Sequence, residues 1–93
     1  MLFVATEADT VVGTVMAGYD GHRGWLYTVA VSPERRRCGI GTALVRHAVG
    51  ALCAAGCAKV NLQIRATNLE VRGFYESLGF EAEERLSMGM HIR

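Results

Sequence analysis

The fold is decided by a stretch that passes from an apolar strand, through a proline and three arginines, into a helix. It reads VAVSPERRRCGIGTAL over residues 29–44. Pro33 ends the strand, and two glycines, Gly39 and Gly41, stand where the helical periodicity begins. The first N–H groups of a helix have no intrahelical partner, and glycines let the backbone approach an anion closely. With arginines beside them, these groups predict a site for a phosphate-bearing cofactor.

Length, charge and cysteine content narrow the classes of protein. The chain has 93 residues, is 51% hydrophobic, and its Lys+Arg count exceeds its Asp+Glu count by 10 − 9 = 1. We therefore expect a single domain over residues 1–93 that is not a general binder of nucleic acid or membrane surfaces. Three cysteines without framework or metal spacing indicate reduced thiols in a cytoplasmic protein, and no metal site. We expect no signal peptide or membrane span.

Periodicity along the chain predicts three strands, a helix, a strand, a second helix and two closing strands. The expected strands cover residues 2–6, 11–19, 25–31, 58–65, 80–85 and 87–92, and the expected helices residues 40–55 and 69–78. The first three strands read as an antiparallel meander, and a strand–helix–strand crossover implies a parallel pair. The predicted fold class is α/β of the α+β kind, with a mixed, mostly antiparallel sheet and flanking helices.

Two blocks of the chain resemble the GNAT superfamily of acetyl-CoA-dependent N-acetyltransferases. The first, RRCGIG at residues 36–41, fits the superfamily's acetyl-CoA loop pattern Q/R-x-x-G-x-G/A. The second, NLEVRGFYESLGF at residues 68–80, resembles its N-x-x-A-x-x-F-Y-x-x-x-G-F block, with Val71 where alanine is usual. Residues 11–24 further resemble a small bacterial acetyltransferase subfamily. The superfamily normally begins with a strand and two helices, so the resemblance implies a GNAT-like fold with a shortened N-terminal end.

The resemblance implies acetyl-CoA as co-substrate and a set of residues that hold it. These are Val29, Val31, Arg36, Arg37, Cys38, Gly39, Gly41, Thr42 and Asn68. In the family, loop N–H groups cradle the pyrophosphate and the strand backbone pairs with the pantetheine arm. By residue type alone, the loop also fits a surface turn before a helix. Val29 and Val31 likewise fit core positions, and Asn68 fits a helix cap.

Tyr75 matches the family's general acid, which protonates the departing CoA thiolate. A core aromatic paired with Phe74 is the alternative interpretation. The general base has no obvious candidate, because strand 25–31 carries Tyr27 and Thr28 in the region where many relatives have a glutamate. A water chain, or an amine that arrives neutral, is an adequate substitute.

The resemblance thus implies an N-acetyltransferase that moves an acetyl group directly from acetyl-CoA to a primary amine, whose identity the sequence does not give. The alternative is a CoA-binding module or partner subunit without catalysis, suggested by the shortened N-terminal end. A nucleotide-binding protein is a third reading, although G-x-x-x-x-G-K-[ST] and a third loop glycine are both missing. Because an exposed apolar sheet face is usually covered by association, we expect a homodimer.

Overall fold

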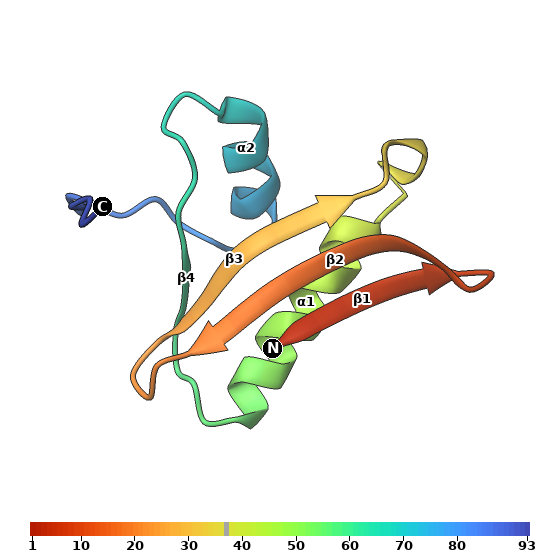
Figure 1. Cartoon of the computed structure of the whole chain (residues 1–93), viewed down its shortest axis with the longest axis horizontal. Coiled ribbons are helices and arrows are strands. Elements are labelled where there is room, and N and C mark those ends of the chain that lie inside the picture. Colours follow the sequence, from red (N-terminus) through yellow and green to blue (C-terminus); the bar gives the residue numbers. More distant parts are fainter. Residues whose placement is uncertain (37) are drawn as a thin grey trace. The chain divides into compact units, whose positions relative to one another are not determined.

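The computed structural model describes residues 1–36 and 38–93. The elements are β1 (Leu2–Glu7), β2 (Thr10–Tyr19), β3 (Gly24–Val31), the 3₁₀ turn η1 (Pro33–Arg35), α1 (Ile40–Ala54), β4 (Val60–Leu62) and α2 (Leu69–Ser77) (Figure 1). The chain divides into two compact units, Met1–Gln63 and Ile64–Arg93, and each is described by itself.

The first unit contains a four-stranded mixed sheet in the order β1-β2-β3-β4. β1 pairs with β2, and β2 with β3, in antiparallel ladders, whereas β3 and β4 are parallel. In Figure 1 the helix that links β3 to β4, α1, crosses behind the meander. The predicted fold class is therefore confirmed, including the parallel pair after the helical crossover.

The turn between β2 and β3 is held by one carboxylate. Asp20 Oδ1 accepts hydrogen bonds from the N–H groups of His22 at 2.8 Å and Arg23 at 2.7 Å. The same N–H groups, Arg23 first, hold the pKa of this carboxyl below its ordinary value of 3.8. Gly21, at φ 89°, supplies the left-handed residue of this Asp-Gly turn.

The core of the first unit forms where α1 packs on one face of the sheet. The buried positions are Val12, Val15, Ala17, Leu26, Leu44, Val45, Ala48, Leu52 and Cys57. Gly13 lets the helix come close, because a Cβ atom added there would lie 2.8 Å from Leu44 Cδ1 and 2.9 Å from Ile40 Cγ2. The buried residues of α1 recur at helical spacing, in agreement with the periodicity that predicts a helix at residues 40–55.

The pairing of β3 with β4 is short. It covers three residue pairs and ends at Leu26 and Leu62, while β3 continues to Val31. The expected strand 58–65 is thus realised only as Val60–Leu62. The second half of β3 extends past the end of its parallel partner strand.

The second unit holds α2, which confirms the helix expected at residues 69–78 and is followed by a glycine. Gly79 has φ 100°, and the N–H groups of Leu78 and Phe80 both donate to Tyr75 O. The predicted strands 80–85 and 87–92 are wrong, since residues 80–93 form neither helix nor strand. The apolar residues that alternate there, Leu86, Met88, Met90 and Ile92, are all more than 80% exposed. Alternation alone does not make a strand, because a strand needs a neighbour for its hydrogen bonds.

Of the helices in the described part of the chain, none combines the length and the apolar character needed to cross a membrane.

Candidate functional site

The loop that follows β3 is fastened to the sheet at its first residue. The N–H of Ser32 donates to Val12 O at 2.8 Å, and the N–H of Arg35 donates to Ser32 O at 2.8 Å. The Ser32 hydroxyl donates to the Glu34 carboxylate, and this bond lowers the pKa of Glu34. The 3₁₀ turn therefore has a fixed origin on β2, from which the rest of the loop extends.

The arginines of the loop have different surroundings. Arg35 forms an ion pair with Glu7, with Nη2 and Oε1 2.6 Å apart. Arg36 has an extended backbone and is exposed, whereas Arg37 lies outside the described residues. Sequence reasoning assigned all three charges to phosphate binding and missed Glu7, which belongs to another strand. Of the two loop arginines that the structure describes, Arg35 is paired with Glu7, and Arg36 is exposed with an extended backbone.

The start of α1 has the backbone geometry of an anion site. Gly39 precedes the helix at φ 80° and ψ 4°, in the left-handed region, and a Cβ atom there would have nothing within 4 Å. The Ala43 N–H closes the first turn by donating to Gly39 O at 3.0 Å. The first turn carries no acidic residue to repel an anion. These features fit a phosphate group at the helix N-terminus.

The remaining loop residues predicted from the sequence surround this turn. Gly41 and Thr42 are half-buried in the first turn of α1, and Cys38 is exposed. The Cys38 thiol donates to Arg36 O at 3.8 Å. The structure thus places these three residues on one short segment with Arg36 and Gly39.

Val29 and Val31 lie on β3 directly before the loop. They pair with Val15 and Gly13 of β2, so their side chains share the sheet face that α1 covers. Both are half-buried. The core interpretation of their side chains therefore holds, while the backbone role stays a prediction.

The second unit positions Asn68 and Tyr75. Asn68 Oδ1 accepts the Val71 N–H at 3.2 Å, so this side chain caps α2, as the alternative interpretation proposed. The Tyr75 ring has edge-to-face contacts with Phe74 and Phe80, at centroid distances of 5.0 and 5.5 Å. Burial raises the pKa of the Tyr75 phenol, which keeps it protonated.

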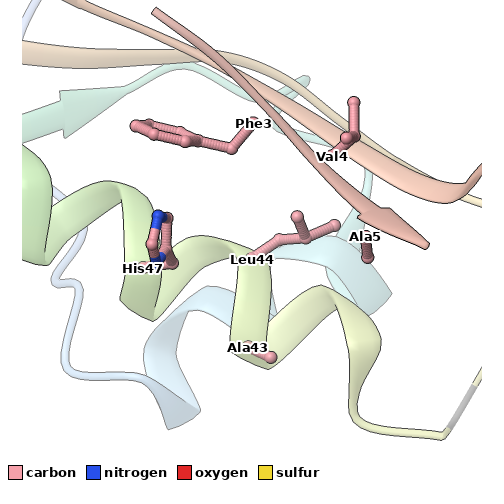
Figure 2. Close-up of a pocket in the computed structure, with 6 residues that line it drawn as sticks. All are labelled: Phe3, Val4, Ala5, Ala43, Leu44 and His47. Carbon is pink, nitrogen blue, oxygen red and sulfur yellow. The ribbon is translucent and has the colours of Figure 1, made fainter.

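A separate hollow of about 270 Å³ lies between β1 and α1, on the first unit (Figure 2). Its lining is Phe3, Val4, Ala5, Ala43, Leu44 and His47. The rings of Phe3 and His47 meet edge to face at 4.7 Å. Sequence reasoning missed this hollow, because it depends on how the first strand crosses the helix. Its apolar lining suits a side chain better than a phosphate.

Comparison with known proteins assigns the family. Residues 1–80 match the model of the acetyltransferase (GNAT) family. An acetyltransferase of Yersinia pestis (strain Pestoides F) is 40% identical over 92 residues, which cover 98% of this chain and 65% of that protein. This chain belongs to the GNAT acetyltransferase family, and it spans just under two thirds of the length of such relatives.

Solved structures agree on the fold. Aminoglycoside N-acetyltransferase AAC(6')-Iy in complex with CoA superposes with a TM-score of 0.85 at 20% identity, covering 99% of this chain and 66% of that one. The ribosomal-protein-S18-alanine N-acetyltransferase from Escherichia coli gives a TM-score of 0.80 at 31% identity, covering 87% and 52%. The resemblance seen in the sequence is therefore confirmed.

Proposed function

We propose that this chain is an acetyl-CoA-dependent N-acetyltransferase that transfers an acetyl group directly to a primary amine. The observation that carries the proposal is the left-handed Gly39 at the start of α1, immediately after a strand and an arginine-bearing loop. The sequence around this helix start lies within the match to the GNAT family. A solved neighbour with the same fold is described as a complex with CoA.

The residues proposed to hold acetyl-CoA divide by the part of the ligand that they suit. Backbone N–H groups of residues 37–42 and the Arg36 guanidinium suit the pyrophosphate, since both supply donors to phosphate oxygens. The backbone of Val29 and Val31 suits the amide groups of the pantetheine arm, because β3 runs on past the last residue of β4. Asn68 already gives its oxygen to the helix cap, so its amide N–H₂ is the part left for the ligand.

Tyr75 is the proposed general acid. Acetyl-CoA supplies the acetyl group and a thiolate leaving group. The raised pKa of the Tyr75 phenol keeps a proton on Oη throughout the physiological pH range, so that it can be donated to sulfur. The β3 strand carries no carboxylate that could act as the base, because residues 24–31 include no Asp or Glu. The acceptor amine is therefore proposed to lose its proton to water.

We further propose that both units act as one acetyl-CoA-binding domain, because the family match runs across them. A cytoplasmic homodimer is proposed, without nucleic acid or membrane partners. The support for association is β1, an edge strand with apolar side chains on both faces. Leu2 and Val4 are 62% and 51% exposed, and Phe3 and Ala5 line the hollow beside α1 (Figure 2).

The test is a panel of amines with acetyl-CoA, in which release of free CoA is measured with a thiol reagent. The panel contains a peptide with an N-terminal alanine, an aminoglycoside, a polyamine, free lysine and a small alkylamine. We expect CoA release with at least one acceptor above the rate without amine. Competition by ATP or NAD against acetyl-CoA binding would instead favour the nucleotide-binding interpretation.

A CoA-binding module without catalysis is the second candidate, favoured by one observation. The β3 strand carries no carboxylate that could act as a base. This candidate predicts tight acetyl-CoA binding by calorimetry and no CoA release with any amine of the panel. The two measurements together therefore separate the two functions.

A further inference from the structure

The ladder between β2 and β3 contains an irregularity that redirects one aromatic side chain. Met16 pairs with Thr28, and the next pair is Ala17 with Leu26, so Tyr27 is an extra residue on β3. Such a bulge increases the local twist and changes the direction of the side chain that it carries. Tyr27 is 62% exposed, although the residues before and after it, Leu26 and Thr28, are both paired with β2.

Tyr27 lies across a glycine of the neighbouring strand. A Cβ atom added at Gly18 would lie 2.9 Å from Tyr27 Cε2, 3.1 Å from Oη and 3.4 Å from Cζ. The space that a side chain at residue 18 would need is thus filled by the tyrosine ring. The edge of the ring that carries Cε2, Cζ and Oη is therefore the part of Tyr27 nearest to Gly18, while the residue as a whole remains 62% exposed.

The ring lies on the sheet face opposite α1. Gly18 follows Ala17, which is 1% exposed and packed in the core, and successive residues of a strand face opposite sides. Met16, 47% exposed, is on the same face as Gly18. β2 and β3 contain no charged residue over their whole lengths, so neither strand places a formal charge on this face. Trp25, which pairs with Gly18 and donates its indole N–H to Asp20 Oδ2, lies on the same face, so these strands present two aromatic rings there. The face of such a ring carries the negative part of its quadrupole.

We infer that Tyr27 is a recognition residue for the ammonium form of the amine acceptor, which docks its cation on a face of this exposed ring. The inference rests on the proposed function for the identity of the ligand. A cation over a tyrosine face is attracted by the ring quadrupole, and adjacent apolar surface such as Met16 suits the alkyl part of an alkylammonium ion. The phenolic hydroxyl is not required for this contact.

The kinetic test compares three substitutions. Tyr27→Leu removes the ring, Tyr27→Phe keeps it, and Gly18→Ala displaces it by adding the Cβ atom that it excludes. We expect Tyr27→Leu and Gly18→Ala to raise KM for the amine roughly 3- to 30-fold, with KM for acetyl-CoA unchanged and Tyr27→Phe close to wild type. The matched control is Tyr19→Leu, since Tyr19 pairs with Gly24, whose added Cβ would meet Leu52 of α1.

A binding test on the wild-type full chain needs no turnover. In a ¹⁵N-resolved NMR titration, n-butylammonium chloride should shift the amide signals of Gly18, Tyr27 and Thr28 saturably, whereas 1-butanol at equal ionic strength should not. Equal shifts with both, or none with either, would overturn the inference. An unchanged amine KM in Tyr27→Leu, in an active protein, overturns it as well. A wild-type protein that releases no CoA with any amine removes the proposed function instead, and the titration then decides the fate of the cation site.

Discussion

Gly39 takes the backbone of the loop through a left-handed conformation that residues with a Cβ atom avoid. The space around it is open, so only the backbone requires a glycine there. Gly50, inside α1, also has nothing within 4 Å of an added Cβ, but its backbone is helical. The two glycines therefore differ in backbone conformation, and neither position has a steric conflict with an added Cβ atom.

Gly39→Ala is expected to destabilise the fold by about 1–2 kcal/mol, because an alanine must be held at positive φ. Gly50→Ala should stabilise it by about 1 kcal/mol, because alanine is the better helix former. Urea denaturation followed by circular dichroism measures both changes. Two changes of the same sign would contradict the backbone conformation described for Gly39.

Tyr75→Phe tests the proposed acid while leaving the aromatic contacts with Phe74 and Phe80 in place. We expect kcat to fall by about 10²-fold or more, the range for loss of a general acid, with KM for acetyl-CoA nearly unchanged. Tyr19→Phe, an aromatic outside the proposed site, serves as the control. Unaltered turnover in Tyr75→Phe removes this residue from catalysis.

The pH dependence of stability follows from the same phenol. Burial raises the pKa of Tyr75 in the folded chain above its ordinary value of 10.0, so the folded state retains this proton longer than the unfolded state. Its contribution is complete below about pH 10 and is lost as the pH rises through the folded pKa. The difference in free energy of unfolding between wild type and Tyr75→Phe should be constant to about pH 10 and shift against wild type above it. A difference that stays constant at higher pH contradicts the burial argument.

The strands and α1 meet through glycines, which sets how closely the helix approaches the sheet. At Gly13 an added Cβ atom would collide with Leu44 and Ile40. At Gly24 an added Cβ atom would lie 2.9 Å from both Cys57 Sγ and Leu52 Cδ1. Both contacts join a strand to the helical layer. The layer spacing of this small domain is therefore sensitive to added volume at two points.

Gly13→Val is expected to destabilise the chain by about 1–3 kcal/mol, the cost of inserting methyl groups into a packed interface. Thr14→Val, on the opposite face of the same strand, adds no volume against α1 and should change stability by less than about 0.5 kcal/mol. Thermal unfolding of the two variants measures the difference. Similar losses in both would show that α1 does not pack on the Gly13 face.

At the scale of helices and strands, the sequence predicts much of the fold and less of the candidate site. The meander, α1 and α2 follow from alternation, helical stripes and glycine stops, and the structure reproduces them. The strand expected at residues 58–65 shrinks to three residues, and those expected at residues 80–92 are missing, because pairing partners are not encoded in local alternation. The loop was predictable from its glycines, whereas the Glu7–Arg35 pair and the placement of Tyr27 on Gly18 depend on strand neighbours.

At the scale of the whole molecule, the outer edge of β1 is the feature that bears on association with another chain. Its six residues contain no proline or lysine, the residues that commonly protect an edge from pairing with another chain. The proposed dimer uses this edge. A two-fold axis beside an antiparallel edge presents the same strand from both copies, which makes the contact self-complementary.

Val4→Lys places a charge on this edge and is expected to convert the dimer into a monomer, because the lysine opposes strand pairing. Light scattering after size-exclusion chromatography measures the mass of each variant. Met88→Lys, which changes a residue 86% exposed outside any strand, is the matched control and should leave the mass unchanged. A wild-type monomer at micromolar concentration, or a dimeric Val4→Lys, rejects the edge contact.

The order of the strands also bears on how the chain reaches its native state. β1, β2 and β3 pair with their immediate neighbours in sequence, across short turns, so little chain entropy opposes their assembly. β4 joins only after α1 has crossed the sheet, and it contributes three residue pairs. We expect the meander to form early with α1 closing on it, and β4 to be the last strand added and the first to exchange its amide protons. The edge of the sheet formed by β4 is then the part that opens most readily, while the extension of β3 stays paired with β2.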